Sequence, residues 1–110
     1  MTVAVTGRDL TRDELVRVAR GHEPVTLDDR ARARMDATRA VVEDAIARGD
    51  AVYGTTTAVG VLKRVGVAPG DGGSYANHML AHHLVGHGEA VGDDVVRGTI
   101  LRLANHLAEG

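Results

Sequence analysis

The chain has 110 residues, which is enough for one small domain that buries a substantial part of its unfolded surface. Its formal charge is −2 with acidic and basic side chains interleaved, so it lacks the basic patch that nucleic acid requires. The absence of cysteine excludes disulfides and cysteine-bound zinc and agrees with a reducing compartment, and no stretch reaches the roughly 18 apolar residues of a membrane span. We therefore expect a cytoplasmic protein with neither nucleic acid nor a membrane as partner.

The apolar residues are mostly Ala, Val and Leu, because the chain has no Phe or Trp and its only aromatics are Tyr53 and Tyr75. A core without large rings is thin, and helices rich in small residues usually pack closely against other helices. This composition indicates that some apolar surface is buried against a partner. We expect the isolated chain to be helical yet poorly packed or self-associating.

The N-terminal part begins with a predicted strand over residues 2–6, where β-branched residues alternate with others. A helix should follow over residues 11–20, because Thr11 and Glu14 have the spacing of a capping box. Gly21 is positioned to end this helix.

A second extended piece is expected over residues 23–27, before a long helix that begins at Asp28 or Asp29 and ends near Arg48. The apolar face of this helix recurs at helical spacing through Ala31, Met35, Thr38, Val42, Ala45 and Ile46. The arginines on its other side, which we interpret as a solvated face without a function, are Arg30, Arg32, Arg34 and Arg39.

The C-terminal half is predicted to contain an extended piece over residues 51–53, a long Gly- and Thr-rich loop over 54–73 that includes Pro69, and a helix over 74–86. Loops of this length are often functional, so the chemistry should be sought there first. A final helix should begin at Asp93 or Asp94, with an apolar face formed by Val96, Ile100, Leu103 and Leu107.

Tyr53 stands at the start of this loop, in the segment Tyr-Gly-Thr-Thr-Thr-Ala-Val-Gly over residues 53–60. A tyrosine in such a place is more often structural, since its ring packs and its hydroxyl finds a hydrogen-bond partner. It acts as a general base near neutral pH only if positive charge or a helix N-terminus stabilises the phenolate. Both interpretations are open from these residues alone.

A histidine cluster follows in the next predicted helix, at His78, His82, His83 and His87. His78 with His82 and His83 with His87 have the i, i+4 spacing that can hold one metal between two imidazoles. Two histidines seldom complete a zinc site, and no glutamate follows in the pattern of a zinc protease. Hydrogen-bonded histidines are the default interpretation, and we assign no metal site.

Taken in order, these residues resemble the histidine, tyrosine and phenylalanine ammonia-lyases, an aromatic amino-acid lyase family with a methylidene-imidazolone electrophile. The resemblance covers the whole chain, and it is carried by Tyr53-Gly54-x-x-Thr57-x-x-Gly60, His82-His83, Gly86-x-Gly88, Asp93-Asp94-x-Val96-Arg97 and Asn105-x-Leu107-x-x-Gly110. It implies a mainly α fold, in which short N-terminal strands precede the helices of an ammonia-lyase-like assembly that this chain forms incompletely. The single domain, residues 1–110, would be an N-terminal part or small subunit carrying the catalytic tyrosine loop at about 53–73.

The resemblance also implies a mechanism. In the family, an internal Ala-Ser-Gly cyclises into the electrophile, and a loop tyrosine removes the β-proton as ammonia leaves. Tyr53 matches that base, and Gly54, Thr56, Thr57 and Gly60 match its loop. His82 and His83 match positions that contact the substrate ring, which favours histidine or tyrosine over phenylalanine as the small amino-acid substrate.

The chain departs from the family in ways that define the alternatives. Thr56, Ala58 and Val59 stand where the family usually has Asn, Gly and Phe, and no Ala-Ser-Gly occurs. We therefore expect the electrophile on a larger ammonia-lyase-like partner chain, in a hetero-oligomer without which this chain is inactive. The alternatives are an aminomutase of the same family, a non-catalytic structural or regulatory partner with the same fold, and a histidine-based metal-binding helical module.

Overall fold

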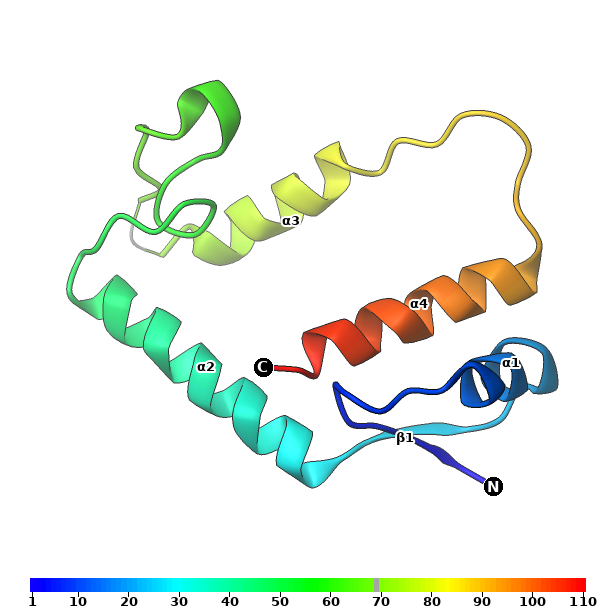
Figure 1. The fold of residues 1–110 in the computed structure, drawn as a ribbon. Coiled ribbons are helices and arrows are strands. Elements are labelled where there is room, and N and C mark those ends of the chain that lie inside the picture. The colour runs from blue at the N-terminus through cyan, green and yellow to red at the C-terminus, as the bar shows by residue number, and fades with distance from the viewer. Residues whose placement is uncertain (69) are drawn as a thin grey trace. The chain divides into compact units, whose positions relative to one another are not determined.

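The computed structural model of the chain describes residues 1–68 and 70–110, so Pro69, which the sequence places in the long loop, lies outside the described residues. The described part is mainly helical (Figure 1), which confirms the predicted fold class. In chain order the elements are β1 (Val3–Val5), α1 (Arg12–Gly21), β2 (Val25–Leu27), α2 (Asp29–Ala47), the short 3-10 helix η1 (Gly60–Leu62), α3 (Gly72–His82) and α4 (Asp93–Leu107). None of the helices described is long and apolar enough to cross a membrane.

The chain forms two compact units. Unit 1 comprises Met1–Ala40 together with Glu89–Gly110, and unit 2 comprises Val41–Gly88. Among the residues that the structure describes, every buried one belongs to unit 1, whereas the candidate chemical residues Tyr53, His82 and His83 belong to unit 2.

The two predicted N-terminal strands pair in parallel, with Val3 opposite Val25 and Val5 opposite Leu27. Alternation along β1 turns Val3 and Val5 into the core and leaves Ala4 exposed. Helix α1 connects the two strands, as a parallel pair requires a crossover.

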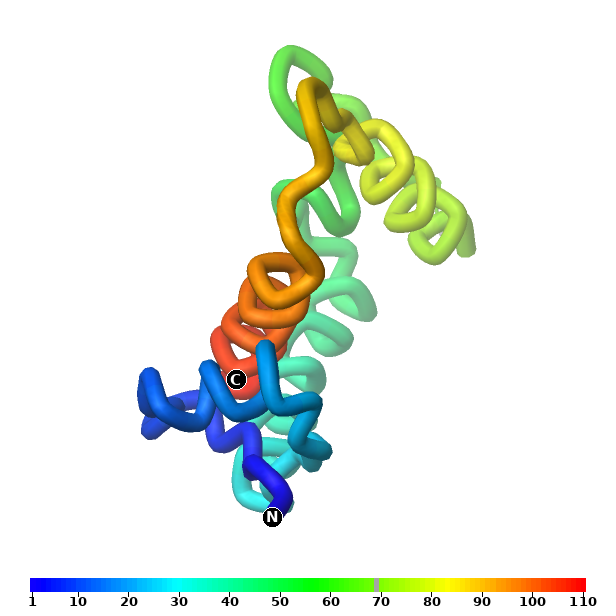
Figure 2. The backbone as a smooth tube through the Cα atoms, turned by 90° about the vertical axis from the view of Figure 1, so that its right-hand side faces the viewer, coloured from blue at the N-terminus to red at the C-terminus, as the bar shows by residue number. Residues whose placement is uncertain are grey.

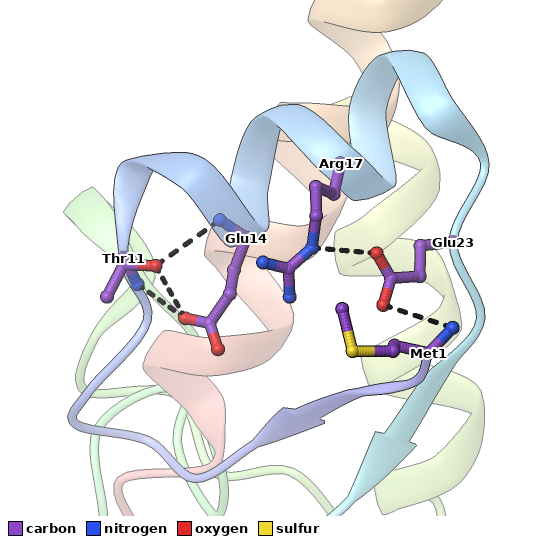
Figure 3. Close-up of polar contacts among 5 residues, drawn as sticks. All are labelled: Met1, Thr11, Glu14, Arg17 and Glu23. Carbon is purple, nitrogen blue, oxygen red and sulfur yellow. Dashed lines mark hydrogen bonds and ion pairs between the residues drawn. The ribbon is translucent and has the colours of Figure 1, made fainter.

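Helix α1 begins at the predicted capping box (Figure 3). The Thr11 hydroxyl accepts a 3.3 Å hydrogen bond from the Glu14 N–H, and the Glu14 carboxylate accepts a 2.9 Å bond from the Thr11 N–H. These bonds to Thr11, the backbone bond foremost, hold the pKa of Glu14 below its usual value of 4.5. The start of this helix is therefore determined by local sequence.

The end of α1 differs from the prediction, because Gly21 lies inside the helix and His22 is the left-handed residue that ends it, at φ 56°. The His22 N–H donates to the Arg17 carbonyl, so the helical hydrogen bonding extends one residue further than Gly21 alone indicated. Figure 3 shows the Glu23 carboxylate next to this end, 2.7 Å from Arg17 Nε and 3.7 Å from the Met1 amine.

The core of unit 1 lies between the strands, α1 and α4, which run side by side in Figures 1 and 2. Its buried hydrophobic cluster is aliphatic throughout and consists of Val3, Val5, Val18, Ala31, Leu101 and Ala108. Gly98 lies where α4 approaches α1, and a Cβ there would lie 3.5 Å from a methyl carbon of Leu15. The thin core expected from composition is thus achieved by close helix approach.

The C-terminal end of α4 is bonded to the turn after β1, next to which it lies in Figure 1. The buried Asn105 side chain accepts a 3.1 Å hydrogen bond from the Gly7 N–H. Gly7 has a φ of 85°, and a Cβ at this position would lie 2.5 Å from the Ala108 carbonyl oxygen. Only glycine fits such a close backbone approach in this conformation.

Arg34 strengthens the same junction, and its interpretation as a solvated arginine is wrong. Its guanidinium is half-buried and donates to the backbone carbonyls of Thr6, Ala108 and Glu109. The ends of a helix and a turn leave these carbonyls without backbone partners. The three hydrogen bonds to them explain why this arginine faces inward. No local pattern distinguishes it from its neighbours on α2.

The predicted apolar face of α4 is also not the face that packs. Gly98, Leu101, Asn105 and Ala108 are buried in unit 1. The predicted stripe is exposed instead, with exposed fractions of 43% for Val96, 61% for Ile100, 56% for Leu103 and 60% for Leu107. Small residues at 98 and 108 permit the close approach to α1 and the turn, and therefore decide which side turns inward.

Unit 2 departs from the prediction in two places. Residues 51–53 form no strand beyond a single bridge between Tyr53 and Thr57, and the loop after them contains η1 and a second bridge from Thr57 to Gly66. Helix α3 begins two residues earlier than predicted and ends at His82 rather than 86. The loop therefore has local structure of its own.

Candidate functional site

Tyr53 is the first residue of the loop of unit 2, and its surface is 63% exposed to solvent. Its hydroxyl oxygen accepts a 3.0 Å hydrogen bond from the Gly60 N–H at the start of η1. Gly54 and Gly60 have φ values of 73° and 61°, a region that favours glycine, and so allow the chain to return to Tyr53. The loop thus presents an accessible phenol whose oxygen has one backbone donor.

The threonines of the loop have structural partners. The Thr56 hydroxyl accepts a 2.8 Å bond from the Val52 N–H and donates a 2.7 Å bond to the Asp50 carbonyl. Thr57 forms both bridges, and its hydroxyl donates to the Ala58 carbonyl at 3.3 Å. At the position where the family usually has Asn, the side chain of Thr56 therefore holds the turn before the loop.

His82 and His83 lie at the end of α3, and both are exposed. The His83 Nδ1 is 2.6 Å from the Met79 carbonyl oxygen, and the His82 ring lies nearly parallel to the His78 ring at 6.4 Å between centroids. The bond to the carbonyl occupies Nδ1 and leaves the other ring nitrogen of His83, Nε2, available for a further hydrogen bond.

The predicted spacing of His83 with His87 does not apply, because the helix ends at His82 and residue 87 lies in the following non-helical segment. Within residues 1–68 and 70–110, no group of three or more potential ligands could hold a metal ion. The His78–His82 pair alone is short of the ligand number that a zinc site needs.

Two features of unit 2 are not evident from the sequence pattern. Gly60 was expected only as a loop glycine, yet its N–H is the partner of the Tyr53 hydroxyl. Tyr75 on α3 was noted only as an aromatic, yet its hydroxyl oxygen is buried and has no hydrogen-bond partner among the described residues. Tyr53 and His83 are not joined by a shared bond, since each pairs with its own backbone neighbour.

Curated relatives match nearly the whole chain. It is 38% identical over 106 residues to the histidine ammonia-lyase of Koribacter versatilis, covering 96% of this chain and 20% of that protein. It is 35% identical over 108 residues to the histidine ammonia-lyase of Alkaliphilus metalliredigens, covering 98% of this chain and 21% of that protein. The chain therefore spans about a fifth of the length of these relatives.

Solved structures share the backbone arrangement. Ergothionase from Treponema denticola matches 99% of this chain with a TM-score of 0.90 and 27% identity, over 22% of its own chain. Tyrosine aminomutase from Streptomyces globisporus matches 100% of it with a TM-score of 0.91, over 21% of that chain, and at 24% identity this shows the fold alone. Residues 10–110 also match the sequence model of one family, so this chain belongs to the family of aromatic amino acid lyases.

Proposed function

We propose that this chain is the N-terminal part or small subunit of an ammonia-lyase-like enzyme, in which Tyr53 is the base that removes the β-proton from histidine or tyrosine. The observation that supports it best is the exposed Tyr53 at the head of the loop, with its hydroxyl oxygen bonded to the Gly60 N–H. This arrangement occurs in a chain of the aromatic amino acid lyase family.

The chemistry follows from what Tyr53 can do. The Gly60 N–H occupies one lone pair of the Tyr53 oxygen, so the phenolic proton points outward, and at this exposed residue it can pass to water before substrate binds. A tyrosinate in contact with substrate can then accept the β-proton, a step that a positioned base accelerates about 10²–10⁴-fold.

The electrophile belongs elsewhere in this proposal, because the chain contains no Ala-Ser-Gly from which it could form. When present, a methylidene-imidazolone makes ammonia a good leaving group. The exposed side of Tyr53 fits a substrate held by such a group on another surface. We therefore propose a larger, Ala-Ser-Gly-bearing chain as the partner.

His82 and His83 are the proposed contacts to the substrate ring. The Met79 carbonyl accepts a hydrogen bond from His83 Nδ1–H, which makes the other ring nitrogen an acceptor. An acceptor here would bind the phenol of tyrosine or the imidazole N–H of histidine, and it has no counterpart on phenylalanine.

A non-catalytic role of the same fold is the second candidate, and one observation favours it. The Thr56 hydroxyl accepts a bond from Val52 and donates its only proton to the Asp50 carbonyl, so it cannot donate a hydrogen bond to a substrate. An aminomutase would use the same Tyr53 and differ only in whether ammonia adds back.

The test of the proposal is Tyr53→Phe, co-expressed with the Koribacter versatilis histidine ammonia-lyase from which the matched N-terminal segment is removed. Removing only the hydroxyl should lower kcat for histidine by at least about 100-fold while the complex still forms. Tyr75→Phe is the matched control, since that hydroxyl has no partner among the described residues, and it should leave kcat within about twofold. Full activity of Tyr53→Phe would support the non-catalytic role instead.

The proposed ring contacts are tested in the same complex with His82→Leu and His83→Leu. Each should change the kcat/KM ratio between histidine and phenylalanine by about 10-fold or more, with little effect on unfolding of the chain, because both residues are exposed. Added zinc or a chelator should change neither quantity. His78→Leu removes an exposed imidazole of the same helix and is the control; an equal shift in that variant would contradict the assignment.

A further inference from the structure

The outer face of α4 is an apolar surface without an occupant. Leu101 and Asn105 are buried on the opposite side of the helix. The outer stripe, defined as Val96, Ile100, Leu103 and Leu107, has the i, i+4, i+7, i+11 spacing of a helix-packing seam, and each of its members is at least 43% exposed. A helix that is apolar on both sides is normally covered on both sides.

A groove between α1 and α4 adjoins the stripe and shares Leu103 with it. Its lining includes the small residues Ala19 and Gly98 and the apolar side chains of Leu15 and Val16 on α1. The stripe and the groove thus give one continuous surface that has the shape to receive a helix.

The flank of this surface has an uncompensated charge. Asp94, at the start of α4, is paired with Arg20 at 3.1 Å. Arg102, which lines the groove near the other end, makes no hydrogen bond or ion pair with any residue that the structure describes. An occupant with an acidic side chain opposite Arg102 would compensate it.

The comparisons indicate where such an occupant comes from. The chain keeps the backbone of solved proteins over 99–100% of its length, with TM-scores of 0.90 and 0.91, yet it covers only 21–22% of them. The same α4 therefore exists within proteins whose remaining length is about four-fifths of the total.

We infer that the outer stripe of α4 is the docking surface for an amphipathic helix of the larger, Ala-Ser-Gly-bearing chain, with an acidic residue of that helix next to Arg102. This inference rests on the proposed function, because it specifies the surface through which the proposed partner binds.

The experiment uses the complete 110-residue chain with an affinity tag, co-expressed with the Koribacter versatilis histidine ammonia-lyase that lacks the matched segment. The wild-type chain should capture this probe, whereas Ile100→Glu and Leu103→Glu should reduce the captured amount at least about 30-fold. Leu84→Glu is the matched control: this leucine is 84% exposed in unit 2, and its substitution should leave capture unchanged. Arg102→Glu should weaken capture by a smaller factor of about 5.

Circular dichroism of each variant alone should match the wild type, because the substituted side chains are exposed in the chain itself. If a glutamate variant loses helix content, the serine variants Ile100→Ser and Leu103→Ser are tested in its place. They should also reduce the amount of probe that is captured. Failure of the wild type to capture the probe, or equal capture by the stripe variants, would overturn the inference. A dimer of this chain, broken by the same variants in sedimentation, would also overturn it in favour of a second copy.

Docking and catalysis have separate readouts. Tyr53→Phe should capture the probe like the wild type while losing activity. Activity that persists in captured Tyr53→Phe complexes would contradict the proposed function and leave the docking surface supported. If every stripe variant still captured the probe and the Tyr53→Phe complex were inactive, only the docking surface would be contradicted.

Discussion

The two units of this chain are stabilised in different ways. In unit 1, side chains from both ends of the sequence meet in one aliphatic cluster, and long-range bonds such as Gly7 to Asn105 close it. In unit 2, none of the residues that the structure describes is classed as buried. Backbone hydrogen bonds between residues close in sequence hold it instead, such as those from the Val67 N–H to the Thr56 carbonyl and from the Ala58 N–H to the Val65 carbonyl.

This difference separates framework from chemistry. The proposed base and ring contacts, Tyr53, His82 and His83, all lie in the exposed unit 2. Exposed segments with local hydrogen bonds open at lower cost than packed cores, and reactive side chains must be reached by substrate. The same type of substitution should therefore destabilise the fold much less in unit 2 than in unit 1.

The largest contrast should come from leucine truncation. Leu101→Ala leaves a cavity in the cluster of unit 1 and should lower the free energy of unfolding by about 4 kcal/mol. Leu80→Ala in unit 2 removes a side chain that is 69% exposed and should change it by less than about 0.5 kcal/mol. Urea unfolding followed by far-ultraviolet circular dichroism measures both, and similar losses would show that unit 2 has a core of comparable weight.

A second contrast compares two glycines of similar backbone conformation. Gly7→Ala places a Cβ 2.5 Å from the Ala108 carbonyl oxygen at a φ of 85°, and should cost about 3 kcal/mol. Gly49→Ala has a φ of 76° but no atom within 4 Å of the added Cβ, so only the backbone cost of about 1 kcal/mol remains. The difference between the two variants in thermal unfolding measures the contribution of the close contact with Ala108. Equal losses of stability would mean that this contact contributes nothing.

The smallest expected effect concerns the local cap of α1. Thr11→Ala removes a side-chain acceptor from the Glu14 N–H and should lower the free energy of unfolding by about 1 kcal/mol, as measured by urea titration. Thr11→Ser, which keeps the hydroxyl, is the control and should stay close to the wild type.

The same cap predicts a dependence on pH. The folded pKa of Glu14 is lowered by its bonds to Thr11, so its contribution to stability is present above the unfolded value, 4.5, and is lost as the pH falls through the folded pKa. The pKa of Asp94 is lowered from 3.8 mainly by its hydrogen bond to Arg20, and its contribution is lost over a similarly acidic range. Glu14→Gln removes the charge that these bonds stabilise and should weaken the acid-induced loss of stability; an unchanged profile would mean that Glu14 does not contribute.

Features set by neighbouring residues were predictable from the sequence. The capping box of α1 and the Asp28 cap of α2 follow from side chains within one helical turn of the backbone groups to which they bond. Helix α4 begins at Asp93, as predicted, but its N-cap is Gly92 and no side chain caps it. Tyr53 and its loop were identified as candidates only through the resemblance to the lyase family, and the family match over residues 10–110 confirms that family. The roles assigned to the site residues remain predictions.

Only the tertiary structure decided which surfaces face inward and which partners meet across the chain. Val96 and Leu103 look like core positions by periodicity, yet small residues at 98 and 108 let the opposite face of α4 approach its neighbours most closely. Arg34 resembles the solvated arginines beside it, but carbonyls at the far end of the sequence bind its guanidinium. Periodicity determines that a helix has an apolar face, whereas the choice between two such faces depends on the shape and unpaired polar groups of distant segments, which no local pattern contains.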